Sequence, residues 1–375
     1  MMEKKEFNII FISCGNYEYD GRLRELLNVA RSMGNVTAFF ASEKNIFLSD
    51  CVCYSTESLS GTSYVKFIAF IIQKTRGLKN IDILFVDNRK AVIPALLLKI
   101  LRHPKAIIQD MRELYLCRQS SSIFSKLGCL FESIMIKCSD VLICANDERV
   151  RLVRRLFKRK KPILSYENIR RLEYSPNADI KKFEKKYKSI FDVKDSFKLI
   201  ATSGCDIARG TIQLIEAIKY NSQKIDLYLV GGGTEDDIKK IDRLMEDLQL
   251  ECIHKIGKVG QDELKYLIAQ CDCGVVNYGA SDLNNKFCAS GKIYEFIFEG
   301  IPVITTTNPP LRNYCKKYGI GVSEEDYGVA INQMIENYNI YKKNAEKLSQ
   351  VIDVEENNTQ IRQKIMYYVR KLFEE

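Results

Sequence analysis

Lys292 has the chemistry to bind an anion. In residues 290–308, SGKIYEFIFEGIPVITTTN, the spacing predicts a helix that begins after Ser290 as its N-cap and ends at Gly300. Lys292 then lies in the first turn, where the helix dipole favours an anion over a cation. A bound anion would offset this placement, whereas a simple surface pair of Lys292 with Glu295 would not explain it.

A second cation follows another predicted strand of the same half. Arg209 lies in GCDIARG, directly after the predicted strand 198–204 and before a glycine that opens the next helix. Its planar guanidinium donates two hydrogen bonds at once, which suits a phosphate; an exposed arginine without a ligand is an equally good interpretation of Arg209 alone. With Lys292 it predicts a diphosphate site, and Glu295, one turn after Lys292, would accept hydrogen bonds from a ribose diol.

These residues need a sheet that brings strand ends together. Continuously apolar segments alternate with helical patterns in both halves of the chain, which predicts parallel sheets covered on both faces. The predicted strands are 8–13, 36–40, 82–87, 106–110, 141–145 and 162–166, then 198–204, 225–233, 252–257, 273–279 and 302–307. The pattern predicts an α/β protein with two doubly wound, Rossmann-like domains that face each other across a cleft.

The domain boundary is expected in a polar segment. We predict an N-terminal domain of residues 1–170, onto which a C-terminal helix of residues 358–375 packs back. The C-terminal domain is predicted to span residues 171–357 and to begin with a linker, 171–195. Ligands of such sheets bind beyond the carboxyl ends of the strands.

Charge is concentrated in the first half. The 375 residues carry a net charge of +9, but residues 1–170 hold 28 Lys and Arg against 17 Asp and Glu, a net of +11. The densest basic run is RVRLVRRLFKRKK, residues 149–161. It is either a solvated helix face or a surface that meets acidic lipid head groups or a phosphate-bearing partner. No nucleic-acid-binding module is recognisable, so nucleic acid is not an expected partner.

Location is inferred from apolar and cysteine content. No apolar run approaches a membrane span, and the start, MMEKKEFNIIFIS, leads into a strand without a signal-peptide cleavage region. The thirteen cysteines are an odd number, which favours reduced core thiols. We expect a cytoplasmic protein that contacts the inner face of the plasma membrane peripherally.

Four segments, taken together in order and spacing, resemble a known family. GCDIARGTIQLIEAI, LYLVGGG, IGKVGQDELKYLIAQCDCGVVNY and SGKIYEFIFEGIPVI are similar to the donor domain of GT-B glycosyltransferases of the family 4 type, which build bacterial surface polysaccharides. SCGNYEYDGRLRELLNVARSMG and IIQDMRELY resemble the N-terminal glycine loop and acceptor-side loop more weakly. The resemblance implies transfer of a sugar from a nucleotide-sugar, such as a UDP- or GDP-sugar, to a glycan or lipid-linked saccharide acceptor.

The resemblance also implies roles for individual residues. Arg209 and Lys292 would hold the diphosphate and stabilise the leaving group, and Arg112 and Glu113 would face the reacting sugar or acceptor. The nucleotide-sugar would be bound by Gly15, Gly204, Arg209, Gly232, Gly233, Gly257, Lys258, Val259, Tyr278, Ser290, Gly291, Lys292, Ile293 and Glu295. No cofactor or metal is expected, because no Asp-x-Asp motif occurs and cationic side chains would replace the metal.

Two departures from the family pattern keep alternatives open. Phe287 stands where the family often has the first of two glutamates, and Arg112, which is always charged and cannot act as a general base, stands where a histidine is common. A transferase that retains configuration needs no dedicated base. The alternatives are a nucleotide-sugar-binding, non-catalytic paralogue and a sugar-nucleotide epimerase on the same fold.

Overall fold

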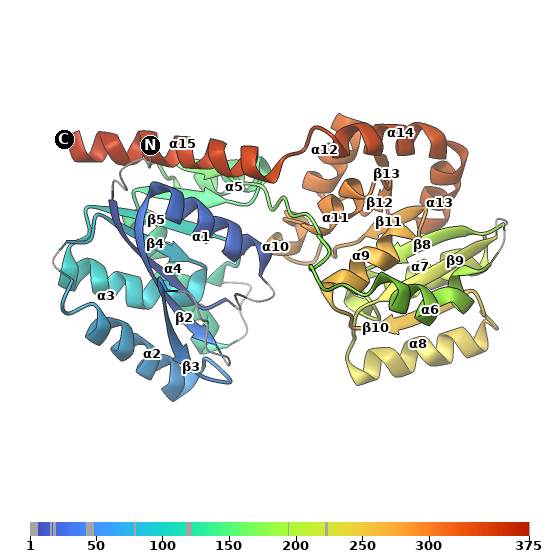
Figure 1. Ribbon diagram of the computed structural model, residues 1–375, viewed down its shortest axis with the longest axis horizontal. Helices are drawn as coiled ribbons and strands as arrows, with labels where there is room; N and C mark the ends of the chain where they lie inside the picture. The colour runs from blue at the N-terminus through green and yellow to red at the C-terminus, as the bar shows by residue number, and fades with distance from the viewer. Residues whose placement is uncertain are drawn as a thin grey trace. The chain divides into compact units, whose positions relative to one another are not determined.

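Two parallel β-sheets dominate the computed structural model, which describes residues 7–15, 17, 20–42, 49–78, 80–117, 122–193, 195–221 and 224–374 (Figure 1). The chain divides into unit 1, residues 1–168 with 354–375, and unit 2, residues 169–353. Each unit has its own sheet, with helices on both faces and its own hydrophobic core. The prediction of two doubly wound α/β domains is therefore confirmed.

The sheet of unit 1 has the strand order β3-β2-β1-β4-β5-β6-β7 within the described residues. Its strands are β1 (Phe7–Ser13), β2 (Gly34–Ser42), β3 (Cys51–Ser55), β4 (Ile83–Asp87), β5 (Ala106–Met111), β6 (Val141–Cys144) and β7 (Ile163–Ser165). Its helices are α1 (Gly21–Met33), α2 (Gly61–Lys74), α3 (Val92–Arg102), α4 (Ile123–Cys138), α5 (Asp147–Phe157) and α15 (Val354–Glu374), with the 3₁₀ turn η1 (Arg89–Ala91).

The helices of unit 1 form two layers. Leu23 of α1 and Ile361 of α15 share one core with Phe11 of β1, while α2, α3 and α4 pack on the opposite face of the sheet. Figure 1 shows α15, in red, lying along α1, in blue, although the two helices stand at opposite ends of the chain.

The sheet of unit 2 has the order β10-β9-β8-β11-β12-β13 within the described residues. Its strands are β8 (Phe197–Ala201), β9 (Ile225–Val230), β10 (Ile253–Gly257), β11 (Cys273–Val276), β12 (Val303–Thr305) and β13 (Gly321–Ser323). Its helices are α6 (Ile180–Phe191), α7 (Thr211–Lys219), α8 (Glu235–Asp247), α9 (Gln261–Ala269), α10 (Leu283–Lys286), α11 (Lys292–Phe298), α12 (Pro309–Tyr318), α13 (Tyr327–Glu336) and α14 (Tyr338–Ser349), with the 3₁₀ turn η3 (Ile207–Arg209).

The central strands of unit 2 position the candidate site. β8 pairs with β9 on one side and with β11 on the other, so chain order reverses at β8. Arg209 follows β8, the triple glycine follows β9, and Lys292 follows β11. Residues from three distant segments therefore meet at the carboxyl edge of one sheet, where doubly wound folds bind ligands.

Several elements differ from the sequence-based expectation. The edge strands β3 and β13 were not expected, and α6 lies inside the segment interpreted as a linker, where it buries Tyr187 against Tyr266 of α9. The thirteen cysteines are all free thiols, as the sequence predicted, and most are buried or partly buried.

Candidate functional site

Lys292 is the first residue of α11 and reaches toward the loop that follows β8. Its Nζ donates a hydrogen bond to the carbonyl of Thr202, 2.9 Å away. The expectation that Ser290 is the N-cap is wrong, because Gly291 occupies that position and makes no side-chain cap. Ser290 lies outside the helix, buried, and its Oγ has no hydrogen-bond partner among the described residues.

The surroundings of Lys292 disfavour the protonated, charged form of its amino group. Burial, the largest cause, and the positive charges of Arg209 and Arg170 together lower the pKa of Lys292 to about 8, against the opposing effect of Asp206. Burying a cation beside two others is costly unless an anion compensates. The folded chain thus holds more positive charge around Lys292 than its own carboxylates balance.

Arg209 is fixed at the end of η3 by neighbouring groups. Its guanidinium stacks over the ring of Tyr278 at 4.2 Å, and its Nη1 donates to the carbonyl of Asn277 at 3.5 Å. Asp206, which caps η3 through a bond to the amide of Ala208, lies 3.7 Å from Arg209 Nε. These contacts hold the guanidinium near Lys292 while leaving part of it exposed, as a ligand-binding arginine requires.

Glu295 has a different partner from the one considered in the sequence. It is 1% exposed and forms an ion pair with Arg170, so the surface pair of Lys292 with Glu295 does not exist in this structure. Its Oε2 has no hydrogen-bond partner among the described residues. Sequence reasoning missed Arg170 because it lies in an irregular polar segment with no periodicity.

Several buried hydroxyl groups around Lys292 are also unsatisfied. The Oγ1 of Thr202, the Oγ of Ser203 and the Oγ of Ser290 are buried and lack a hydrogen-bond partner within the described parts of the chain. Thr202 and Ser203 lie in the loop that Lys292 contacts, and Ser290 stands two residues before Lys292. Buried polar atoms are normally paired, and these hydroxyls have hydrogen-bonding capacity to offer a polar ligand.

The glycines after β8 and β9 bring two loops into close contact. Gly204 has φ +65°, and a Cβ there would lie 2.4 Å from the carbonyl carbon of Gly231. A Cβ at Gly233 would lie 2.5 Å from the carbonyl oxygen of Cys205, whose amide donates to Gly232. Gly204 and Gly233 therefore serve loop packing, and their predicted contact with a nucleotide-sugar stays a prediction.

The residues predicted to flank the base lie at the end of β10. Gly257 has φ +73° with open space where a Cβ would stand, and its carbonyl accepts from the amide of Gly231 at 2.7 Å. Lys258 is exposed and passes close to Gly232, and Val259 packs on the core of unit 2. Ile293 is a buried core side chain, which leaves only its backbone for a ligand.

Two of the site residues predicted in unit 1, Gly15 and Arg112, are joined to Asp87 in one polar network. The amide of Gly15 donates to Ser13 Oγ at 3.0 Å, and Ser13 Oγ donates to Asp87 at 2.5 Å. Arg112 donates to Asp87 through Nε at 2.6 Å and also pairs with Asp20, the N-cap of α1. Arg112 thus has protein carboxylates as partners, and its role toward a sugar stays a prediction.

Electrostatics in unit 1 follow from burial. Burial, opposed by the charge of Arg112 and reinforced by the charge of Asp110, raises the pKa of Asp87 to about 6. Glu113 is exposed on the neighbouring loop. Burial, opposed by Arg89 and reinforced by the charge of Glu113, raises the pKa of Glu132 to about 7.

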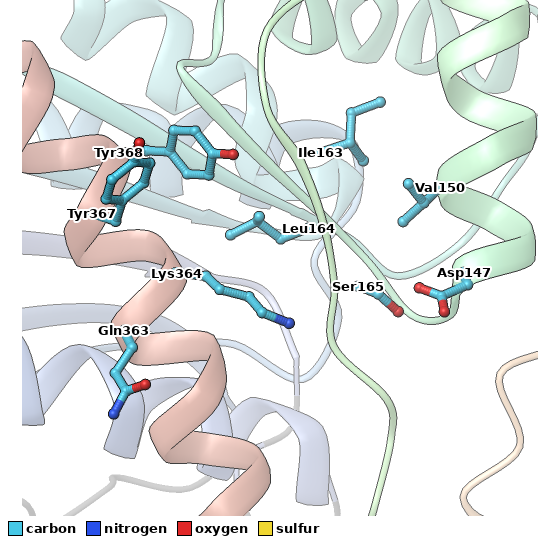
Figure 2. A pocket seen from close by; sticks show the side chains of 9 residues that line it. All are labelled: Asp147, Val150, Ile163, Leu164, Ser165, Gln363, Lys364, Tyr367 and Tyr368. Atoms are coloured by element: carbon cyan, nitrogen blue, oxygen red, sulfur yellow. The ribbon is translucent and has the colours of Figure 1, made fainter.

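A surface pocket of about 490 Å³ lies elsewhere in unit 1 (Figure 2). It is formed by α5, β7 and α15, with Val150, Leu164 and Tyr368 among its lining side chains. None of the predicted site residues lines it. Its lining is mixed, with an acid, a lysine and two tyrosines.

Comparisons with known proteins bear on the fold. No protein-family model and no curated protein matches the sequence. Among solved structures, HepE from Anabaena in complex with UDP and glucose superposes with a TM-score of 0.71 at 15% identity, covering 96% of this chain and 100% of HepE.

Two further structures give the same result. Sucrose-phosphate synthase from Thermosynechococcus elongatus has a TM-score of 0.71 at 16% identity, covering 98% of this chain and 99% of the synthase. WaaG, a glycosyltransferase involved in lipopolysaccharide biosynthesis, has a TM-score of 0.66 at 14% identity, covering 95% and 99% of the two chains. The chain has the GT-B fold of these enzymes, while the family 4 type and the cleft between the domains stay predictions.

Proposed function

We propose that this protein is a glycosyltransferase that moves a sugar from a nucleotide-sugar to a glycan or lipid-linked saccharide acceptor, with retention of configuration and without a metal. The observation that carries the proposal is the surplus of positive charge around Lys292. The positive charges of Arg209 and Arg170 repel the ammonium group of Lys292. Burial and the two arginines together lower the pKa of Lys292 to about 8. A diphosphate supplies the negative charge that this environment lacks.

The chemistry follows from where negative charge develops during transfer. As the glycosidic bond breaks, charge accumulates on the leaving diphosphate, and fixed cations in a buried site stabilise that charge strongly. Arg209 would hold the diphosphate through two N–H groups, while Lys292 would act as a second positive charge. A bound diphosphate would also keep Lys292 protonated by opposing the two arginines. Attack from the same face, assisted by an oxygen of the leaving phosphate, needs no general base from the protein.

The donor class is supported by the unpaired polar atoms and by the fold neighbours. HepE is described in complexes with UDP, with UDP and glucose, and with UDP-glucose. In this chain the unsatisfied Oε2 of Glu295 would accept a hydrogen bond from a ribose hydroxyl, and the hydroxyls of Ser203 and Ser290 would donate to phosphate or sugar oxygens. A UDP- or GDP-sugar is therefore the expected donor.

Thermal unfolding with a panel of nucleotides and nucleotide-sugars tests the donor site. A ligand present at about 100 times its Kd stabilises the folded protein by about 2.7 kcal/mol. We expect one nucleoside diphosphate to stabilise the wild type equally with and without EDTA. Arg209→Ala should lose this effect, whereas Arg243→Ala, which removes an exposed arginine of α8, should keep it. No stabilisation by any member of the panel would refute the proposal.

Product analysis separates transfer from the two alternatives. Slow hydrolysis of the stabilising nucleotide-sugar, and transfer to a membrane-extract acceptor, are the expected outcomes for a transferase. Binding without turnover under both conditions would identify a non-catalytic paralogue, and interconversion of two nucleotide-sugars an epimerase. Neither histidine is placed for epimerase chemistry. The Nε2 of His254 lies 2.9 Å from Oδ1 of Asp226, and its ring stacks on Tyr228. His103 is the C-cap residue of α3.

A further inference from the structure

The outward face of α4 is apolar, which is unusual for a helix that covers a sheet. Phe124 is 87% exposed and Ile123 is 74% exposed. Leu127, Leu130 and Ile134 continue the exposed series along the helix. A helix on the surface of a globular domain normally turns its apolar stripe inward and presents polar side chains to water.

Helical geometry places these side chains on one stripe. At about 100° per residue, Ile123, Leu127, Leu130 and Ile134 fall within an arc of about 60°, with Phe124 about 60° beyond its edge. The inward side of α4 has its own buried residues, Cys129, Glu132, Met135 and Ile136. The helix therefore has two apolar faces, and only the inner one is covered.

Neighbouring α3 also carries exposed apolar side chains. Ile100 and Leu101 are exposed at the end of α3. Lys99 of α3 donates to the carbonyl of Cys138 at 3.5 Å, which places this end of α3 beside the end of α4. Large contiguous apolar surfaces on soluble proteins mark sites of interaction.

The charges around this stripe are positive. Lys126 and Lys137 are exposed on α4, at one edge of the stripe, and Glu132, the acidic residue of the helix, is buried in an ion pair with Arg89. Residues 92–161, which contain α3, α4 and α5, hold 15 Lys and Arg against 6 Asp and Glu, a net of +9 that includes the buried Arg149 and Arg159. An apolar stripe bordered by lysines matches the interface of an anionic bilayer, where acyl chains lie beneath negative head groups.

We propose that α4 is a membrane-docking helix that inserts Ile123, Phe124, Leu127, Leu130 and Ile134 into the surface of an anionic lipid bilayer, while Lys126 and Lys137 contact the head groups. The helix lies in the plane of the interface and does not cross it. No helix in the described part of the chain is long and apolar enough to span a membrane. A second copy of the chain fits this face less well, because pairing two such faces would bring their lysines and the surrounding positive charge together.

The absence of tryptophan from the sequence allows a direct test. Phe124→Trp creates a protein with a single tryptophan on the proposed docking face. With vesicles of phosphatidylglycerol and phosphatidylcholine, we expect its emission to shift to the blue and to be quenched by brominated acyl chains. Tyr220→Trp, at an 81% exposed aromatic position of unit 2, is the matched control and should show neither effect.

Vesicle sedimentation gives the energetic arm of the test. Ile123→Ser with Phe124→Ser should weaken partitioning at least tenfold, because two apolar side chains no longer leave water on insertion. Ile340→Ser with Val351→Ser, a matched pair of exposed apolar residues in unit 2, should leave partitioning unchanged. Lys126→Gln or Lys137→Gln should weaken binding about fivefold each at low salt, and phosphatidylcholine alone should bind weakly.

Three results would overturn the proposal. The first is that the wild type does not bind anionic vesicles, and the second is that the Ile123→Ser, Phe124→Ser variant binds them as tightly as the wild type. The third is that the wild type is a dimer, and that this variant becomes a monomer without any change in vesicle binding. The experiment needs no nucleotide-sugar. Failure of docking is therefore distinguishable from failure of the proposed donor site, which the nucleotide panel reports separately.

Discussion

Replacing Lys292 by methionine should stabilise the unliganded protein while removing its response to a nucleoside diphosphate. Methionine keeps the unbranched shape of lysine and removes the buried charge. The change in the pKa of Lys292 from its usual 10.5 to about 8 corresponds to about 3 kcal/mol that the folded state loses by holding the proton. Loss of the hydrogen bond to Thr202 costs about 1 kcal/mol, so the expected net gain is about 2 kcal/mol.

The gain should depend on pH in one direction. Below about pH 8 Lys292 is protonated in both the folded and the unfolded chain, so the full cost is present in the wild type. Between about pH 8 and 10.5 the unfolded chain keeps a proton that the folded chain has released, so the free energy of unfolding of the wild type rises with pH. The advantage of Lys292→Met should therefore be largest at pH 7 and shrink by pH 9.5.

Thermal unfolding at these two pH values is the assay. For a unit of this size, about 2 kcal/mol corresponds to a rise of about 4–8 °C in the Tm of unit 2 at pH 7. Lys240→Met, which removes an exposed lysine of α8, is the matched control and should leave Tm within about 1 °C. The nucleoside diphosphate that stabilises the wild type should bind Lys292→Met at least about tenfold more weakly, because a charge-assisted contact is lost.

The outcome also separates two accounts of the site. A Tm of Lys292→Met equal to or below that of the wild type at pH 7 would mean that the three cations do not repel one another in the folded chain. A gain that stays the same at pH 9.5 would mean that it comes from packing and not from charge. Either result would refute the reasoning that the positive charge around Lys292 is in excess without a bound diphosphate.

Two further perturbations test the surroundings of Lys292. Gly204→Ala should destabilise unit 2 by more than about 3 kcal/mol in urea unfolding, because its Cβ would lie 2.4 Å from the backbone of Gly231. Gly257→Ala has a similar φ but open space around the Cβ, so it should cost only about 1–2 kcal/mol. Equal costs for the two variants would contradict the close contact of the two loops. Arg170→Gln should lower the free energy of unfolding by about 1–3 kcal/mol by leaving Glu295 buried and uncompensated, and adding Glu295→Gln should restore most of it. Strictly additive losses would show that Arg170 and Glu295 do not act as a pair.

The sequence predicts the strands that are buried on both faces of their sheet. Runs such as NIIFIS and ILFVD are mostly apolar because strands of a parallel sheet are covered on both faces, and they form β1 and β4 as expected. The strands that were missed are at the edges. CVCYS of β3 is only partly buried, and GVS of β13 is three residues long, so neither produces a continuous apolar signal.

The site is predictable in its local parts and not in its long-range pairs. Lys292 and Arg209 could be linked because strand order places the ends of β8 and β11 side by side. The pairing of Arg170 with Glu295 could not be predicted, since it joins an irregular segment to a helix 125 positions later through side chains alone. α6 was hidden for a related reason, because its lysine-rich sequence leaves Tyr187 as its one buried residue.

The two ends of the chain build unit 1 together, and this has a consequence for synthesis on the ribosome. Ile361, Ile365 and Val369 of α15 complete a core that begins with strand β1, so this core stays open until the last helix has left the exit tunnel. Unit 2 is continuous in sequence, and all its residues are synthesised before α15. During translation unit 2 can therefore fold first, while the core-facing side of α1 stays uncovered until α15 is available, and uncovered apolar surface of this kind is prone to aggregate.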